Sequence, residues 1–512
     1  MSDTVDVAIV GAGAAGALLA ARLGEAGLSV VMFEAGPGWA ATDLVSSQLY
    51  SRRLRWGGPH VASTGADPIG FGFNAGWGVG GAALHHYATW PRLKPADFTV
   101  HSDHGSGADW PIGYDTLRPY YDRIQAEVGI AGDAAAEIWR PAGAPYPMPP
   151  HPPLKQGAVL ERAFTAAGIR TAPAPMAVNT VEYGNRPPCQ YDGWCDAGCP
   201  IMALANPLAV YLPRAEAAGV KLLANTPVTR VLAGSGGRVD GVEYLAGGKR
   251  VVQPARLVIL AGSVVGNPAL LLASGLGGPA VGHGVMTHGL IQILGLFPDA
   301  TEPHRGMTGA HLISHDAYAK TATPGAFGSR QWLIAPSIKP NDLAGLAAAR
   351  MDLNGAALDA FMHRAVRHAA NMIGMCEALP DAANRVELTD TVNAWGVRAA
   401  RLVHRWSPDA KRLYAALRDE GEAVFKAGGA TEVWHSPMGS AHLMGGTAMG
   451  RDPATSVVDD FGRVHGMANL YVAGTGLFPT AGAVNPTFTL HALALRTSDH
   501  LIAERATLFG HA

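Results

Sequence analysis

The first 35 positions alternate between apolar runs and glycine-marked turns, a pattern that predicts a strand, a helix and a second strand. Val5 to Val10 form a short apolar run suited to a buried parallel strand. An Ala- and Leu-rich stretch that runs to about Gly27 predicts a helix, and Ser29 to Phe33 form the second apolar run. This order predicts an α/β domain of the doubly wound kind.

Three glycines stand between the first strand and the helix in G-x-G-x-x-G spacing. Gly11 allows the tight turn, Gly13 lets the backbone approach a pyrophosphate, and Gly16 lets the helix pack closely on the strand. Ala14 lies at the helix start, where free N–H groups face phosphates. Glu34 ends the second strand and is placed to accept from a ribose hydroxyl. The segment therefore predicts a dinucleotide site, without distinguishing FAD from NAD.

Later parts of the chain mix the two periodicities. Thr226 to Val231 and Leu257 to Ser263 predict strands of the same domain. Residues 285–440 combine strand-like runs with Ala-rich helices, such as Asp359 to Ala378. Residues 140–153 are rich in proline and predict an ordered surface connection. The sequence shows no internal repeat and no low-complexity tail.

Composition narrows the class of protein. The chain has 512 residues, 48% of them hydrophobic, and a formal net charge of −2. A nearly neutral chain lacks the basic surface that nucleic-acid binding needs, so we expect no nucleic-acid partner. No run reaches the roughly 18–20 apolar residues of a membrane span. The first residues show neither a basic start nor a cleavage site, so we expect a cytoplasmic protein.

Two further segments carry specific patterns. Gly and Ala fill most positions from Gly76 to Ala83, including Gly80 and Gly81, so the backbone there can press against a flat or phosphorylated group. The second segment runs from His442 in HLMGGT to Arg496, through AVNPTFTLHALALR. With these two segments and the N-terminal block, the sequence resembles the glucose–methanol–choline (GMC) oxidoreductases.

That resemblance extends over effectively the whole chain and implies FAD as the cofactor and oxidation of an alcohol as the reaction. It also implies two domains: a discontinuous Rossmann-like FAD-binding domain (residues 1–110, 205–284 and 440–512) and a substrate domain on an antiparallel sheet (111–204 and 285–439). Val228 is then expected near the adenine. Val264, Asn267 and Gly474 depart from the family's usual residues and leave the subfamily open.

Alcohol oxidation needs a base for the hydroxyl proton and a group that orients the oxygen. The chain has 20 histidines, and only the match to the family motif singles out His442 as the base. Asn485 matches the second catalytic position. Asn485 also suits an N-cap, with Pro486 and Thr487 opening a helix whose positive end faces the flavin. His85 stands where some relatives attach the flavin covalently, whereas others hold dissociable FAD.

The stretch CQYDGWCDAGCP (residues 189–200) contains three of the four cysteines, Cys189, Cys195 and Cys199. A disulfide with one free thiol, a zinc site completed by a distant ligand, and inert buried thiols are each compatible with the pattern. The stretch also resembles one GMC branch, the bacterial FAD-dependent glucose and sugar dehydrogenases. That likeness implies a [3Fe–4S] cluster on the three thiols. Cys376 is expected to be a core thiol.

The same branch implies partners: a cytochrome c subunit that accepts electrons, and a small signal-bearing subunit that carries the enzyme to the periplasm. The leading hypothesis is therefore an FAD-dependent dehydrogenase of an alcohol, sugar or sugar alcohol that passes electrons through iron–sulfur to a cytochrome or quinone. One alternative is a cluster-free oxidase that uses oxygen. Another is a non-catalytic flavin-binding protein, or a lyase or isomerase, on the same fold.

Overall fold

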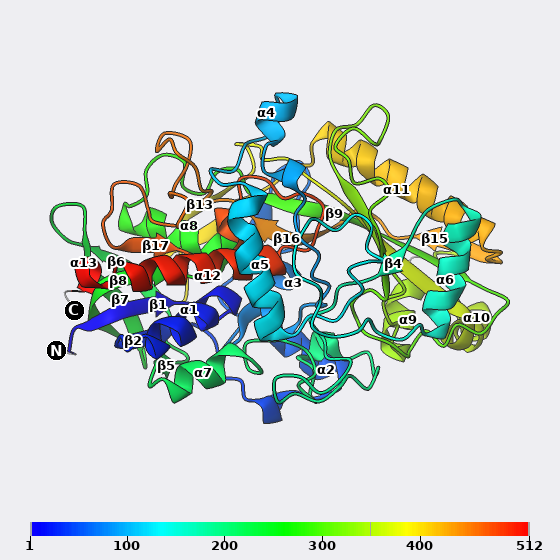
Figure 1. Cartoon of the computed structure of the whole chain (residues 1–512), viewed down its shortest axis with the longest axis horizontal. Helices are drawn as coiled ribbons and strands as arrows, with labels where there is room; N and C mark the ends of the chain where they lie inside the picture. Colours follow the sequence, from blue (N-terminus) through cyan, green and yellow to red (C-terminus); the bar gives the residue numbers. More distant parts are fainter. Residues whose placement is uncertain (1–2, 349, 510–512) are drawn as a thin grey trace.

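The fold was analysed in a computed structural model that describes residues 3–348 and 350–509. Figure 1 shows one half of the molecule built around α1 and α12 and the other around α11, with strand β9 crossing between them. The molecule is thus built around two sheets, and each sheet has its own set of packed helices.

The first sheet has seven strands in the order β5-β2-β1-β8-β7-β6, with β17 also paired to β8. The pairs of β1 with β2 and β8, of β2 with β5 and of β17 with β8 are parallel, and β6, β7 and β8 form an antiparallel meander. Its strands are β1 (Val5–Val10), β2 (Val30–Phe33), β5 (Lys221–Leu223), β6 (Val228–Ala233), β7 (Val239–Ala246), β8 (Lys249–Leu260) and β17 (Leu470–Val472).

The second sheet is antiparallel throughout and has the order β15-β9-β12-β11-β10-β4, with β16 also paired to β9. We call it the roof sheet. Its strands are β4 (Ala172–Pro173), β9 (Met286–Leu296), β10 (Leu312–Ser314), β11 (Arg330–Ile334), β12 (Ala369–Cys376), β15 (Glu432–His435) and β16 (Gly439–Met444). A small third sheet joins β3 (Ala62–Thr64), β13 (Arg385–Val392) and β14 (Arg398–Val403).

Helices cover the outer faces of both sheets. Helix α1 packs on α7 and α12, and α12 also packs on α5, whereas α11 covers β9 and β12 beside α6. The helices are α1 (Ala14–Glu25), α2 (Gln48–Ser51), α3 (Phe71–Asn74), α4 (Val100–His104), α5 (Tyr114–Val128), α6 (Lys155–Ala166), α7 (Tyr211–Ala217), α8 (Ser263–Ser274), α9 (Pro340–Ala347), α10 (Gly355–His368), α11 (Pro408–Ala427), α12 (Thr487–Ala503) and α13 (Arg505–Phe509). Within the described residues, no helix combines the length and apolarity that crossing a membrane requires.

The α/β class with a Rossmann-like sheet and a second antiparallel sheet is confirmed, but two local predictions are wrong. The run Asp359 to Ala378 is not one helix: α10 ends at His368 and β12 begins at Ala369, because this alanine-rich segment pairs with β9 and β11 in the middle of the roof sheet. Cys376 is fully buried, as expected, but on this strand. The strand expected over Leu257 to Ser263 ends at Leu260, and Ser263 opens α8.

Candidate active site between the two sheets

A large cavity of about 380 Å³ lies where the glycine turns of the first sheet meet the roof sheet. The expected cofactor and catalytic residues that line it are Gly11, Gly13, Ala14, Glu34, Gly81, His85, Val228, His442, Gly474, Asn485, Pro486 and Thr487. Gly16 and Gly80 are buried and do not line it. One cavity therefore brings together segments from both ends and the middle of the chain.

The glycines shape this cavity by close backbone contact. Gly11 has φ +107°, and a Cβ there would lie 2.4 Å from the Ala261 carbonyl oxygen. A Cβ on Gly16 would lie 2.0 Å from the Gly11 oxygen, so only glycine lets α1 leave the turn here. Gly81 also approaches the backbone of Gly13: its Cβ would stand 3.0 Å from the Gly13 Cα. The two glycine loops thus form one continuous backbone surface.

The residues present fit a dinucleotide such as FAD. Gly474 has φ +113°, and a Cβ there would meet no atom within 4 Å, so a larger side chain would project into free space beside the cavity lining. The buried Glu34 carboxylate accepts from the backbone N–H groups of Ala12 (3.1 Å) and Gly36 (2.8 Å) and lines the same cavity. It has lone pairs to spare for a ribose hydroxyl, because an ionised carboxylate offers about four acceptor sites.

His442 lies on an irregular part of the roof sheet. Strand β16 pairs with β9, and the register shifts between Ala441 and Met444. His442 falls inside that irregularity with φ +63°, a conformation rare for residues other than glycine. Such bulges re-aim side chains and are enriched at active sites. The bulge explains how an edge strand delivers an imidazole to the cavity.

His442 has a partner that the sequence did not single out. Its Nδ1 lies 3.1 Å from Nδ1 of His288 on β9, and Nε2 of His288 lies 3.0 Å from the Gly482 carbonyl oxygen. Burial lowers the pKa of His288 to about 4, so the ring is neutral and carries one proton. Since a carbonyl can only accept, that proton is on Nε2. Nδ1 of His288 therefore accepts from Nδ1–H of His442.

This network determines which ring nitrogen of His442 can accept a proton. With its proton held on Nδ1, His442 keeps a lone pair on Nε2. Burial, and then the positive charges that His288 and His86 would carry, lower the pKa of His442 to about 3. The imidazole is therefore neutral across the neutral pH range, and Nε2 can accept a proton.

Asn485 is oriented by a second chain of hydrogen bonds. His315 Nε2 donates to Gln331 Oε1 (2.8 Å), so the Gln331 amide turns its Nε2 to Asn485 Oδ1, 3.3 Å away. The Asn485 oxygen is thereby occupied, and its NH₂ group is the free donor. The expected N-cap role of Asn485 is wrong: α12 begins at Thr487, Pro486 occupies the cap position, and no side chain caps the helix, because Gln331 holds the Asn485 amide.

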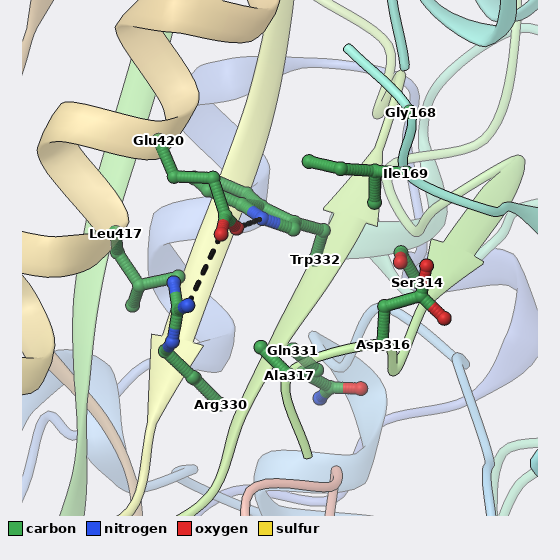
Figure 2. A pocket seen from close by; sticks show the side chains of 10 residues that line it. All are labelled: Gly168, Ile169, Ser314, Asp316, Ala317, Arg330, Gln331, Trp332, Leu417 and Glu420. Atoms are coloured by element: carbon green, nitrogen blue, oxygen red, sulfur yellow. Dashed lines mark hydrogen bonds and ion pairs between the residues drawn. The ribbon is translucent and has the colours of Figure 1, made fainter. Parts of the chain in front are cut away.

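The roof sheet contributes an aliphatic surface that alternation along the strands explains. Leu290, Leu333, Ile373 and Met375 line the cavity, whereas Trp332 on β11 points to the opposite face, among the side chains under α11. A smaller cavity of about 220 Å³ lies on that outer face. There Glu420 accepts from Arg330 (3.0 Å) and from the Trp332 indole (2.7 Å), as Figure 2 shows.

The three clustered cysteines lie next to the cavity wall. All are free thiols; Cys195 and Cys199 are buried and Cys189 is half-buried. The turn Cys195–Ala197 contacts the turn Gly81–Leu84, which borders the cavity. In the described part of the chain, no three His, Cys, Asp or Glu side chains are gathered as metal ligands. The predicted metal role of the three thiols thus stays a prediction.

Comparison with known proteins gives one family. Its two sequence profiles, both described as GMC oxidoreductase, match residues 8–290 and 380–494. The fructose dehydrogenase large subunit of Gluconobacter japonicus is 29% identical over 98% of both chains. The 6'''-hydroxyparomomycin C oxidase of Streptomyces lividus is 30% identical over 98% of this chain and 92% of that protein.

Solved structures show the same fold. Formate oxidase from Aspergillus oryzae RIB40 superposes with a TM-score of 0.72 over 99% of this chain and all of that one, at 16% identity. Pyridoxine 4-oxidase from Mesorbium loti gives a TM-score of 0.69 over 97% of this chain and 99% of that one, at 18% identity. At these identities the likeness concerns architecture alone.

Proposed function

The chain belongs to the GMC oxidoreductase family, and on that premise we propose that it is an FAD-dependent dehydrogenase of an uncharged alcohol, sugar or sugar alcohol. The family places the reaction among oxidations of CH–OH groups. The observation that carries the finer proposal is the opposite hydrogen-bonding polarity of His442 and Asn485 in one cavity.

The two side chains complement an alcohol oxygen. Nε2 of His442 accepts the hydroxyl proton, so the O–H bond breaks as the N–H bond forms. The Asn485 NH₂ group donates to the same oxygen and holds its second lone pair. Bound FAD supplies the acceptor for the hydride that leaves the carbon. The aliphatic side chains of the roof sheet keep water from competing for Nε2.

The charge of the lining supports an uncharged substrate. Among the described residues that line the cavity there is no lysine and no arginine, and Glu34 is its one carboxylate. A substrate carboxylate would have no cation to pair with, and burying it unpaired is costly. Relatives named for fructose and for 2-methyl-1,2-propanediol fit this chemistry.

The test is anaerobic mixing of the FAD-loaded protein with a panel of primary and secondary alcohols, sugars, sugar alcohols and matched hydroxy acids. We expect uncharged members to bleach the flavin absorbance and the hydroxy acids to leave it unchanged. Reoxidation is then compared between an artificial dye and dissolved oxygen, and a dehydrogenase prefers the dye. Bleaching by hydroxy acids alone would contradict the proposed substrate class, and fast reoxidation by oxygen would favour an oxidase.

We expect the FAD to be held without a covalent bond. Nε2 of His85 lies 3.3 Å from the Ala75 carbonyl oxygen, and the backbone carbonyl of His85 itself also acts on the ring. Burial lowers the pKa of His85 to about 4. Nε2 carries the proton of the neutral ring and donates it to Ala75, so a covalent bond to the flavin at this nitrogen would have to break that hydrogen bond. Acid precipitation is therefore expected to leave the yellow colour in the supernatant, and a yellow pellet would show a covalent link.

We further propose that electrons leave through a [3Fe–4S] cluster on Cys189, Cys195 and Cys199. Backbone N–H groups point at these sulfurs: Tyr191 N–H donates to Cys189 Sγ at 3.3 Å, and N–H groups of Ala203 and Leu204 act on Cys199. Hydrogen bonds of this kind tune iron–sulfur centres. Each thiol also lies within electrostatic range of another. The three soft ligands and their N–H donors support the proposal, and the loop would have to bring the sulfurs closer together to bind a cluster, since the described residues hold no gathered set of three metal ligands.

The cavity wall lies between these thiols and the flavin site. Burial, and then the negative charge of Asp196, raise the pKa of the Tyr87 phenol, and Tyr87 lines the cavity. Tyr87 therefore belongs to the cavity lining and lies within electrostatic range of Asp196 in the cysteine loop. A cytochrome c subunit or a quinone is the acceptor that this arrangement suits, with a small subunit as a further partner.

Replacing Cys195 with serine is expected to remove the iron and leave flavin reduction by alcohol intact. Protein purified without oxygen is assayed for iron and acid-labile sulfide per FAD, with electron paramagnetic resonance. We expect about three irons per FAD in the parent protein. Cys376→Ser is the control, because Cys376 lies on the roof sheet and should keep the iron. A parent protein without iron would exclude the cluster while leaving the alcohol dehydrogenase proposal standing.

A further inference from the structure

Three charged side chains are buried together behind the active site. Lys320 Nζ donates to Asp97 Oδ1 and to Glu377 Oε2, each at 2.7 Å. The side chains are 3%, 0% and 0% exposed. We call this group the Lys320 cluster. Two carboxylates and one ammonium give the cluster a net charge of −1, which is unusual for side chains so fully buried.

The Lys320 cluster holds the loop 480–484, which leads into Asn485. Glu377 Oε1 accepts from the Gly482 N–H at 3.2 Å. Tyr318 donates to Asp97 Oδ2 at 2.8 Å and accepts from the Ala483 N–H at 3.2 Å. Gly482 has φ +56°, and a Cβ there would lie 2.6 Å from the Tyr318 hydroxyl oxygen. Glu377 directly, and Asp97 through Tyr318, therefore hold the backbone of this loop in place by hydrogen bonds.

Gly482 connects this cluster to the base. Its N–H donates to Glu377, and its carbonyl accepts from His288, which in turn accepts from His442. The connection from the Glu377 carboxylate to the His442 ring thus consists of hydrogen bonds and one glycine. The charges of Lys320 and Asp97 act on His288 in opposite directions: Lys320 lowers its pKa and Asp97 raises it.

We infer that the Lys320 cluster is a positioning element for His442: it fixes His288 as the acceptor of the His442 Nδ1 proton, and its net negative charge stabilises the positive charge that His442 gains with the substrate proton. This inference rests on the proposed function and adds a role for residues that touch neither substrate nor cofactor. The arrangement resembles a buried acid that supports a catalytic histidine, except that here the acid reaches His442 through His288 and the Gly482 carbonyl.

The other titratable groups nearby do not cancel this charge. His86 acts electrostatically on His442, and His315 lies beside Tyr318 (5.3 Å between rings); burial lowers the pKa values of His86 and His315, so both rings are neutral. The Lys94 ammonium lies 5.6 Å from the Tyr318 ring centre, but it is attracted by Glu137 as well as by Asp97. The Lys320 cluster therefore remains the source of negative charge behind the two histidines.

Two variants separate charge from structure. Glu377→Gln brings the net charge to zero, and we expect the limiting rate of flavin reduction to fall roughly three- to tenfold, with the dissociation constant of the alcohol unchanged. Lys320→Met combined with Glu377→Gln leaves Asp97 alone and restores −1, so most of the lost rate should return. A purely structural role predicts the reverse, since the double variant removes more of the cluster.

The control is Glu420→Gln, the same substitution on the outer face of the roof sheet (Figure 2), which should leave the rate unchanged. Independently of turnover, ¹⁵N resonances of labelled histidines, assigned with His442→Ala and His288→Ala, should show Nδ1–H on His442 and Nε2–H on His288. A double variant slower than Glu377→Gln, an unchanged rate in Glu377→Gln, or Nε2–H on His442 would overturn the inference. If no alcohol reduces the parent flavin, the proposed function fails, and the ¹⁵N pattern still tests the arrangement.

Discussion

Replacing His442 with alanine is expected to slow flavin reduction by alcohol roughly 10²- to 10⁴-fold, the range that a positioned general base contributes. The neutral ring is locked with its proton on Nδ1, so Nε2 is available at every pH from mildly acidic to alkaline. The rate is read in anaerobic stopped-flow at saturating alcohol. FAD content should be unchanged, because the glycine loops, rather than His442, form the backbone surface that fits the cofactor.

His435→Ala is the matched control for His442→Ala. His435 belongs to the neighbouring strand β15 and its Nδ1 lies 2.9 Å from a Glu422 carboxylate oxygen, with 36% of the side chain exposed. Its removal should change the rate little. Retained fast reduction in His442→Ala would reject the base assignment, whereas equal losses in both variants would indicate general damage to the roof sheet.

The N-terminal unit was predictable because its signals are local. The apolar runs, the glycine spacing and the acid at position 34 all fall within about 30 residues, and each of these signals indicates one structural feature. Strand β1 occupies Val5–Val10, the range expected from the apolar run. Helix α1 ends at Glu25, close to the expected Gly27, because Gly27 has a positive φ that stops the helix.

His288 and Gln331 escaped sequence reasoning because their roles depend on pairing between distant strands. His288 is one polar residue in an apolar strand, and nothing local shows that it will face His442, 154 positions later. A signal did exist: His288 and the cavity-lining Leu290 are two apart on β9 and therefore share a face. Sequence reasoning singled out His442 through a motif and could not find the residues that orient it.

The segment 369–376 shows how tertiary pairing overrides local propensity. Two alanines begin it and a long helix precedes it, so composition favours helix. The structure pairs every residue of β12 with β9 and five of them with β11, which buries the strand on both faces. Fully buried central strands lose the alternation that would identify them.

Asn485 was wrongly expected to cap a helix for a related reason. Its hydrogen-bond partner, the Gln331 amide, lies 154 positions away on strand β11.

Removing the ammonium of the Lys320 cluster is expected to have the largest effect on stability. Lys320→Met leaves Asp97 and Glu377 facing each other without a cation, and breaking a buried ion pair by deleting one partner costs about 3–5 kcal/mol of the free energy of unfolding. That is a large share of a typical domain's total. Denaturant unfolding measures it. Lys411→Met removes a lysine from an exposed pair with Asp67 and should cost less than about 1 kcal/mol.

The stability deficit of Lys320→Met should change with pH in a direction that simple loss of packing would not produce. In the parent protein, burial lowers the pKa of Lys320, but the two carboxylates more than offset it and raise the pKa above its usual range. The stability this contributes is fully present below about pH 10.4 and is lost only above it, as the pH rises through the folded-state value. In Lys320→Met, one carboxyl must take up a proton, so its folded pKa rises above the unfolded value of about 4.

A carboxyl with a raised pKa contributes stability that is present at low pH and is lost as the pH rises. The deficit of Lys320→Met should therefore be small near pH 4 and grow toward neutrality. Adding Glu377→Gln removes one of the two like charges, so the double variant should be more stable than Lys320→Met at pH 8 and lose that advantage near pH 4. A deficit that does not change with pH would mean that lost packing, rather than unpaired charge, destabilises the protein. The same pair of variants thus tests the stability of the fold and the function of His442, because the charge balance of the Lys320 cluster supports both the loop 480–484 and His442.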